Sequence, residues 1–179
     1  MSKPTKKATL SCLLALLPLI SHAQTCQTSS IPATTPDTQF TNNNNGTVTD
    51  NKTGLMWKRC SEGQSFNTGT HACDGSTATY TWQGALQQAQ SVNTAGFAGA
   101  NDWRVPNIKE LRSLVELQCV GPSINLMVFP ATPSAVFWSS SSYANHSGNA
   151  WFVNFNGGYG DAFLKKHGSY QVRLVRIGQ

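Results

Sequence analysis

The 179-residue chain is poor in charge, since Asp, Glu, Lys and Arg together make up only 12% of it. It contains no Cys-x-x-Cys pair, no Gly-x-Ser-x-Gly sequence and no cysteine after Cys119. The first absence weighs against a zinc knuckle, and the second against a serine nucleophile on a strand-to-helix elbow. We also find no internal repeat. Gly, Ser, Thr and Asn fill the polar positions instead, a composition common in proteins that work outside the cytoplasm.

The long apolar runs that mark membrane helices are missing except at the N-terminus. There, Lys3, Lys6 and Lys7 precede an apolar run over residues 10–20, and Ser21, His22 and Ala23 follow it. The run is shorter than the ~20 residues that cross a bilayer, and small residues occupy the positions that a signal peptidase reads. We therefore predict a signal peptide over residues 1–23, in preference to a retained membrane anchor. The mature protein would be exported, periplasmic or extracellular, without a transmembrane span.

Cleavage would also change the charge and the cysteine count. It would remove three of the 13 Lys and Arg residues and none of the eight Asp and Glu residues, so the net charge would fall from +5 to +2. Such a weak positive charge does not support nucleic-acid binding. Cys26, Cys60, Cys73 and Cys119 would remain, and an even number in an exported protein indicates disulfides. Three pairings are open, and we favour Cys60–Cys73 with Cys26–Cys119.

The pattern along the mature chain divides it into an extension and one domain. Residues 24–45 are rich in Thr, Ser, Pro and Asn without periodicity, which predicts an extension pinned at Cys26. A domain is expected over residues 46–178. It opens with a β-hairpin, because two short β runs at 47–50 and 55–58 flank a turn that ends in Gly54. Helical spacing of apolar residues, a Thr81 cap and a stop at Gly96 then predict a first helix.

A second helix is predicted to begin within the stretch from Asn101 to Leu111. Pro106 closes a short extended run at 104–105, Asn107 is a good N-cap, and Glu110 stands where a capping box places its acidic residue. We expect this helix to end near Gln118 and Cys119. Alternating apolar residues and Gly-rich turns then predict four antiparallel strands, at 136–140, 150–155, 162–165 and 171–177. The predicted fold class is α+β: hairpin, two helices, then a C-terminal antiparallel β meander.

Several separated blocks of this sequence resemble one known family, the Lcl C-terminal domain family, over roughly residues 46–177. The blocks are Val48-x-Asp50-x-x-Thr53-Gly54-Leu55-Met56-Trp57, Trp82-x-x-Ala85-Leu86, Asp102-Trp103-Arg104-Val105-Pro106-Asn107-x-x-Glu110-Leu111, Phe137-Trp138-Ser139-Ser140, Ala150-Trp151-x-Val153-x-Phe155 and Val172-Arg173-Leu174-Val175-Arg176.

The resemblance implies a C-type-lectin-like fold, distantly similar to the formylglycine-generating, sulfatase-modifying group. The founding member of the family is a collagen-like adhesin that binds sulfated glycosaminoglycans through this domain. This chain lacks the collagen-like repeat. The residues that we interpret as fold determinants are Trp57, Trp103, Arg104, Pro106, Glu110, Trp138 and Trp151.

Catalytic and metal chemistry find little support in the sequence. His71, His146 and His167 each lie in a Gly- or Ser-rich segment, and a general base needs a partner that holds it. Formylglycine-type oxidation needs cysteines in the C-terminal part, where there are none. Asp161, Asn149, Asn154 and Asn156 supply oxygen atoms, but a single carboxylate makes a poor calcium site, and Asn and Asp also shape turns. We predict no cofactor, no metal and no enzymatic activity.

Binding residues are predicted in the last third of the chain. Tyr143 and Tyr159 occur beside Asn145, Asn149 and glycines, as aromatic residues of binding surfaces do, although packing explains them equally well. Lys165, Lys166 and Arg173 form a late basic cluster that suits sulfate groups, or else a solvated or internally paired face. The leading hypothesis is a non-enzymatic, adhesin-like module that binds a polysaccharide, an anionic glycan or another cell-surface ligand. A structural or assembly component of the cell envelope or of a surface appendage, with a possible envelope protein as its partner, is the alternative, and an enzyme ranks last.

Overall fold

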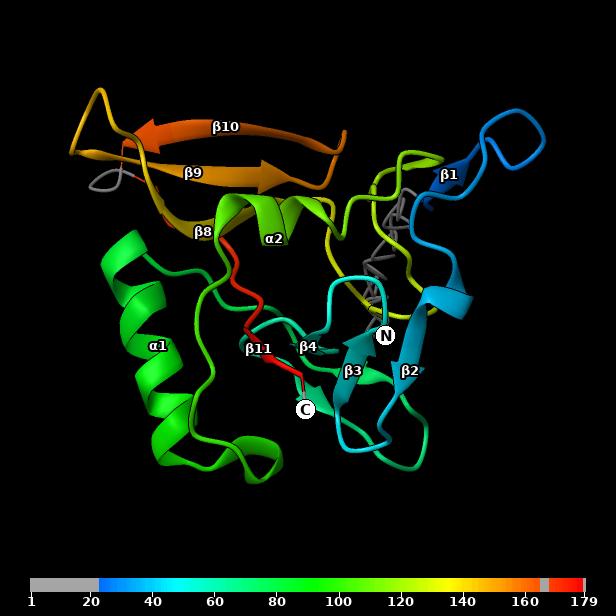
Figure 1. Cartoon of the computed structure of the whole chain (residues 1–179), viewed down its shortest axis with the longest axis horizontal. Helices are drawn as coiled ribbons and strands as arrows, with labels where there is room; N and C mark the ends of the chain where they lie inside the picture. The colour runs from blue at the N-terminus through cyan, green and yellow to red at the C-terminus, as the bar shows by residue number, and fades with distance from the viewer. Residues whose placement is uncertain (1–22, 165–167, 179) are drawn as a thin grey trace, which may run out of the picture.

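The computed structural model describes residues 23–164 and 168–178 (Figure 1). These described residues form a mixed α/β structure with two α-helices and four small antiparallel sheets. The predicted signal peptide, except Ala23, and Lys165, Lys166 and His167 lie outside the described residues.

A four-stranded sheet forms around the predicted hairpin, with the strand order β11-β4-β3-β2. Its strands are β2 (Phe40–Asn42), β3 (Thr47–Asp50), β4 (Leu55–Lys58) and β11 (Val175–Ile177). The β3–β4 turn is held by Asp50, whose carboxylate accepts hydrogen bonds from the Lys52 N–H and the Thr53 hydroxyl. Gly54 completes this turn with φ +71°, a value that favours glycine. The hairpin prediction is therefore confirmed, and β2 shows that the predicted extension contributes a strand to the same sheet.

A three-stranded sheet has the order β10-β9-β8 and contains β8 (Val136–Ser142), β9 (Asn149–Asn154) and β10 (Tyr159–Leu164). These are the first three strands of the predicted meander. The fourth predicted strand does not join them. Gln171 forms a single bridge to Phe137 of β8, and the chain then crosses to the other sheet, where Val175 pairs with Trp57 of β4. Residues 172–175 are all buried, so alternation could not reveal which sheet they join.

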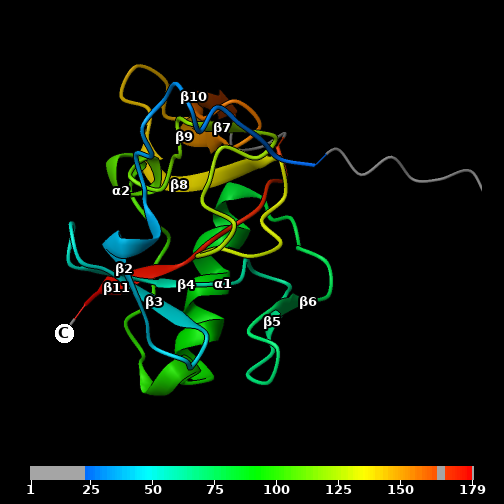
Figure 2. The same cartoon turned by 90° about the vertical axis from the view of Figure 1, so that its right-hand side faces the viewer.

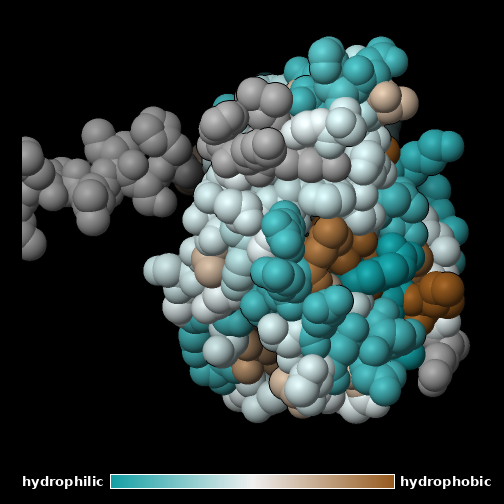
Figure 3. Space-filling view, turned by 90° about the vertical axis from the view of Figure 1, so that its left-hand side faces the viewer, coloured by the Kyte–Doolittle hydropathy of each residue, from teal (hydrophilic) through white to brown (hydrophobic). Residues whose placement is uncertain are grey.

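Helix α1 (Trp82–Thr94) begins as predicted, because the Thr81 hydroxyl accepts a hydrogen bond from the Gly84 N–H. Gly96 follows it with left-handed backbone geometry. Ala85, Ala89 and Val92 face the interior, whereas the exposed Gln83, Gln87 and Gln90 face solvent. Figure 3 views the side of the molecule that carries α1, and most of that surface is hydrophilic with a few separate hydrophobic patches.

Helix α2 (Ile108–Arg112) has the predicted capping box between Asn107 and Glu110, but it is only five residues long. The prediction that it extends to Gln118 and Cys119 is wrong. Val115 instead forms a bridge to Ile124, and the Glu116 carboxylate accepts hydrogen bonds from the backbone N–H groups of Thr34 and Thr35. These tertiary contacts outweigh the helical preference of the segment.

The remaining elements are short. They are β1 (Thr25–Cys26), which pairs with β7 (Cys119–Val120), β5 (Ser65–Phe66), which pairs with β6 (Cys73–Asp74), and two turns of 3-10 helix, η1 (Asp37–Gln39) and η2 (Phe97–Gly99).

Two buried clusters hold the layers together, one on each face of the three-stranded sheet. One joins α2 and the four-stranded sheet through Leu111, Phe137, Val153, Trp57 and Val175, and the other joins α1 through Ala85, Trp138 and Phe152. Figures 1 and 2 both place α2 between the two larger sheets. The three-stranded sheet is therefore covered on both sides, but its β8–β9 loop projects beyond the helices (Figure 1).

Candidate functional site

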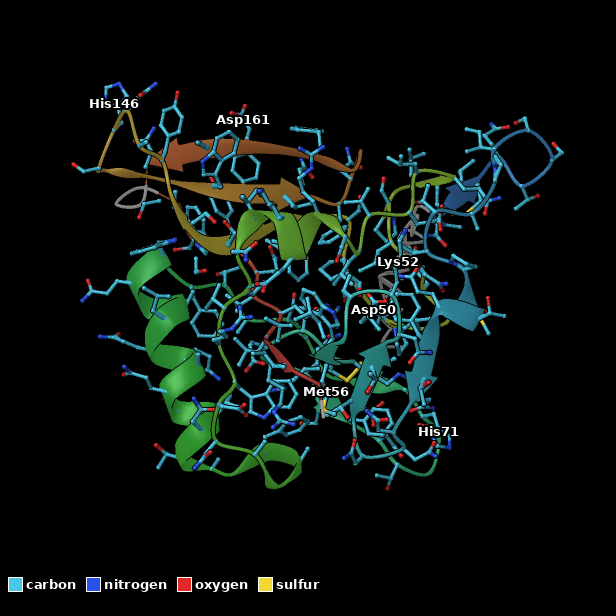
Figure 4. All side chains as sticks on the ribbon, viewed as in Figure 1. Asp50, Lys52, Met56, His71, His146 and Asp161 are labelled. Carbon is cyan, nitrogen blue, oxygen red and sulfur yellow. A yellow bond between two sulfur atoms is a disulfide. The ribbon has the colours of Figure 1, made fainter. Side chains whose placement is uncertain are left out.

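The end of the three-stranded sheet that carries the β8–β9 loop combines three aromatic rings. The Tyr143 ring meets the Trp151 ring edge to face at 5.6 Å between centroids and stacks on the His146 imidazole at 6.4 Å. Tyr143 and Trp151 are half-buried and His146 is exposed. Figure 4 shows His146 at the tip of this loop, far from His71. We call Tyr143, His146 and Trp151, together with Asn145 and Asn149, the aromatic end.

The two asparagines add polar groups to these rings. The exposed Asn145 amide lies 3.4 Å from the Tyr143 hydroxyl, a long hydrogen bond that leaves most of its capacity to solvent or ligand. Asn149 is half-buried, and its Oδ1 is enclosed without a hydrogen-bond partner among the described residues. A buried acceptor without a partner costs free energy.

Helix α2 carries two basic side chains and packs against β8, β9 and β10 of the same sheet. Its first N–H donates to the Ser141 hydroxyl on β8, and a Cβ on Gly160 of β10 would lie 3.5 Å from Cδ of Arg112. Gly160 and Ala162 point to the same face of the sheet as Trp151, which pairs with Ala162. Lys109 and Arg112 are exposed. The sequence analysis did not assign them, although the helical phase places both outside the buried face of Leu111.

Tyr159 does not join this group. It begins β10 opposite Asn154, whereas Asn149 at the aromatic end pairs with Leu164. Five residue steps along a strand place the two ends roughly 17 Å apart. Tyr159 is 53% exposed, and its hydroxyl accepts a hydrogen bond from the Asn154 amide. The structure therefore separates the two tyrosines that the sequence analysis grouped, while Lys165 and Lys166 lie outside the described residues.

Arg173 does not lie on a basic surface, and this part of the prediction is corrected. Its side chain is completely buried, and the guanidinium donates to the Lys58 and Arg59 carbonyls and to the Ser61 and Thr132 hydroxyls. Burial lowers the pKa of Arg173 to about 9, although the nearby Glu62 carboxylate opposes this. The guanidinium also lies over the Phe129 ring. Arg173 is a buried cross-link between segments far apart in sequence, out of reach of a surface ligand.

The residues predicted as fold determinants mostly lie in the interior. Trp57, Trp103, Pro106 and Trp138 are buried, whereas Trp151 is half-buried and belongs to the aromatic end. Arg104 pairs with Glu110 through two hydrogen bonds of 2.7 Å each. Burial would raise the pKa of Glu110, but hydrogen bonds from Arg104 and the Asn107 N–H outweigh it and hold the pKa below its ordinary value. Arg176 pairs with Asp102 at 2.6 Å.

In the described part of the chain, the side chains that could bind a metal ion lie apart from one another. Across residues 23–164 and 168–178, no group of three or more His, Cys, Asp and Glu side chains converges as metal ligands would. Asp161 lies on the outer strand β10 (Figure 4), and its carboxylate accepts a hydrogen bond from the Ala162 N–H. Asn154 and Asn156 form turn and side-chain hydrogen bonds.

Both favoured disulfides are present. Cys26 is bonded to Cys119 and joins β1 to β7, and Cys60 is bonded to Cys73 and closes the loop that contains β5. Disulfides of this kind persist in oxidising compartments. Within the described residues, none of the helices has the length and apolar character needed to cross a bilayer.

Comparison with known proteins agrees with the sequence blocks. A search of curated proteins found no match. The model of one family, described as the Lcl C-terminal domain, matches residues 46–176. This range includes both larger sheets except β2 and Ile177, the last residue of β11. The matched region covers most of the chain, and it contains both helices and every residue of the aromatic end. The chain therefore belongs to the Lcl C-terminal domain family.

Proposed function

We propose that this protein is an exported, non-enzymatic binding module that recognises a polysaccharide, and in particular an anionic glycan, at its aromatic end. The observation that carries the proposal is the contact between the half-exposed rings of Tyr143 and Trp151, beside two asparagine amides. Aromatic faces pack against apolar surfaces while their polar neighbours form hydrogen bonds, and sugar rings offer both kinds of group.

The hydrogen-bonding groups at this end favour a hydroxylated ligand. The enclosed Oδ1 of Asn149 accepts no hydrogen bond from the described residues, and a sugar hydroxyl is a donor of the right kind. The amide of Asn145 and the exposed imidazole of His146 complete a set of groups that orient a ligand without a nucleophile or a metal. These features support binding in preference to catalysis.

The preference for an anionic glycan rests on α2. Lys109 and Arg112 are exposed, and no carboxylate of the described residues lies within ion-pair distance of either. Arginine binds carboxylate and sulfate groups through two parallel hydrogen bonds. The sulfated ligands of the founding family member agree with this proposal, and so would the C-type-lectin-like core that the family resemblance implies. Export is proposed on the N-terminal pattern and on the two disulfides.

A heparin-binding measurement tests the proposal with matched variants. We expect wild-type protein to bind heparin in a salt-sensitive manner, Arg112→Gln to weaken binding about threefold to tenfold, and Trp151→Ala to weaken it at least tenfold. Tyr159→Ala, at the other end of the sheet, is the control and should bind like wild type. If heparin and an array of neutral and acidic glycans give no binding, or if Tyr159→Ala weakens binding as strongly as Trp151→Ala, the proposed site is wrong.

A structural role in the envelope is the second candidate, favoured by a different observation. Leu117, Val120 and Met127 are 61%, 52% and 76% exposed, and Met127 lines a cleft of about 430 Å³ beside the Cys26–Cys119 disulfide. Exposed apolar side chains beside a cleft are typical of protein contacts. In that case, a native envelope extract should yield one stoichiometric partner that Leu117→Asp and Met127→Asp both fail to retain.

A further inference from the structure

The end of strand β4 buries more positive than negative charge. Lys58, Arg59 and Arg173 are 8%, 6% and 0% exposed, and the one buried carboxylate beside them is that of Glu62. The Glu62 carboxylate forms an ion pair with Lys58, with 2.6 Å between the Lys58 ammonium and Glu62 Oε1. Arg173 donates to four hydrogen-bond acceptors and lies over the Phe129 ring, although its Nε has no partner among the described residues. Arg59 is therefore the cation of this group whose charge is least compensated.

Two of the three nitrogens of the Arg59 guanidinium have partners, and both partners are neutral. Nε donates to the Val128 carbonyl at 2.9 Å and Nη2 donates to the Met127 carbonyl at 3.1 Å. Nη1 is enclosed without a partner, and no carboxylate of the described residues lies within 4.0 Å of the guanidinium. The Phe66 ring lies 5.4 Å away, a weak contact. A buried cation with this environment is expensive unless an anion accompanies it.

Arg59 also lines a small cleft, so an anion has a path to it. The cleft measures about 210 Å³ and lies between the four-stranded sheet and the segment at residues 127–128. Its other lining residues are Asp37, Phe40, Asn42, Val48, Met127 and Val128. The Met127 side chain is 76% exposed, and an unbranched thioether moves aside easily. Rotation of Met127 would open the way from solvent to the guanidinium.

The residues that line the cleft favour some kinds of anion over others. Phe40, Val48 and Val128 present apolar walls, which favour an organic ion over a strongly hydrated inorganic one. One unpaired nitrogen matches a single charged group, and the exposed Asp37 carboxylate opposes a second negative charge. We propose that this cleft is a binding site for the carboxylate group of a small organic monoanion, with Arg59 as its charge partner. The site lies against β2 and β3 and is separate from the aromatic end.

The test is an NMR titration of the Arg59 Nε–Hε signal in ¹⁵N-labelled full-length mature protein, at constant ionic strength. The probes are sodium acetate, sodium glucuronate and sodium sulfate. We expect acetate and glucuronate to shift this signal saturably in the millimolar range, since small ligands bind weakly, and sulfate to bind at least tenfold more weakly. Arg59→Lys keeps the charge but loses the planar donor pair, so it should weaken acetate binding at least tenfold.

A second variant keeps the test decisive if Arg59→Lys fails to fold. Asp37→Asn removes the opposing charge at the mouth and keeps an oxygen for the Asn125 amide, which now donates to the Asp37 carboxylate. It should tighten acetate binding about twofold to fivefold. Trp151→Ala should leave the acetate titration unchanged, which separates this site from the proposed glycan site. Shifts that never saturate, equal binding of sulfate and acetate, or unchanged affinity in Asp37→Asn would each overturn the proposal.

Discussion

The two larger sheets of this protein differ in how deeply the polar and aromatic side chains around them are buried. Around the four-stranded sheet, Arg173 and Glu62 are buried and contact other protein groups, and Trp57 is fully buried. At the open end of the three-stranded sheet, Tyr143 and Trp151 remain half-exposed, with Asn145 and His146 in solvent. The chemistry of a residue type therefore does not predict its environment here, because position relative to the two cores decides whether the side chain is buried or remains exposed.

The largest expected effect comes from the buried side of this comparison. Arg173→Met should lower the free energy of unfolding by about 3–5 kcal/mol, because it leaves the Lys58 carbonyl and the Ser61 and Thr132 hydroxyls without their buried donor. Urea unfolding measures this. Arg112→Met, an exposed arginine, is the matched control and should change stability by less than about 0.5 kcal/mol. Equal losses in both variants would remove the distinction between the two sheets.

The next effect concerns the loop that leaves the four-stranded sheet. Replacing Cys60 and Cys73 together by Ala should cost about 3 kcal/mol, because their bridge closes a loop with a sequence separation of 13 residues. Thermal unfolding with and without reductant measures the change. Heparin binding by the folded fraction should be unaffected, since the aromatic end lies in the other sheet. A loss of binding at full folding would show that the two regions are coupled.

A smaller effect is expected at the Arg104–Glu110 pair, which lies between the two regions. Arg104 is 42% exposed in its side chain, so Arg104→Ala should cost only about 1 kcal/mol at neutral pH. Chemical denaturation at pH 7 measures this loss, and Arg104→Lys, which keeps the charge, should recover part of it.

The same pair predicts how stability depends on pH. The pKa of Glu110 is lower in the folded protein than its ordinary value of 4.5, despite burial, because Arg104 and the Asn107 N–H stabilise the carboxylate. Such a group contributes stability that is complete above the unfolded pKa and is lost as pH falls through the folded pKa. Stability should therefore decrease from about pH 5 towards pH 3, and it should decrease less in Arg104→Ala. An identical acid profile in both proteins would contradict this assignment.

The smallest expected effect on stability belongs to Tyr159 on the exposed surface, and Trp151 at the aromatic end provides the comparison. Tyr159→Ala and Trp151→Ala remove an exposed and a half-exposed ring, and we expect losses of under about 0.5 kcal/mol and about 1–2 kcal/mol, respectively. Calorimetry measures both. If Trp151→Ala destabilised the protein by as much as Arg173→Met, Trp151 would belong to the core and the aromatic end would lose its central residue.

Local sequence signals predicted the parts of the fold that short-range interactions control. The Asp50 turn, the Thr81 cap and the Asn107–Glu110 capping box each depend on groups within four residues of one another, so their residue types were sufficient. The length of α2 and the partner of β11 were predicted wrongly. Thr34 and Thr35, about 80 residues away, draw Glu116 out of a helix, and the buried run 172–175 carries no alternation that identifies its sheet.

The candidate sites were likewise predicted from the sequence only in part. Sequence reasoning proposed Tyr143, Asn145 and Asn149, which the structure gathers, but it also grouped Tyr159 with them and placed Arg173 on the surface. It missed Arg112, because a single arginine on a short helix carries no motif. It could not distinguish Arg59 from any other arginine, because the lack of a buried anionic partner is a property of the assembled interior.

The sequence by itself determined the family, the hairpin and the positions where the two helices begin, and it favoured the disulfide pairing that the structure contains. These follow from residue types at fixed short spacings and, for the disulfides, from four cysteines with few pairings. Only the tertiary structure decided which arginines are buried, which aromatic rings remain open and which strands share a sheet. Those outcomes depend on contacts between segments as far apart in sequence as Lys58 and Arg173. The free energy of such contacts cannot be read from a local sequence pattern.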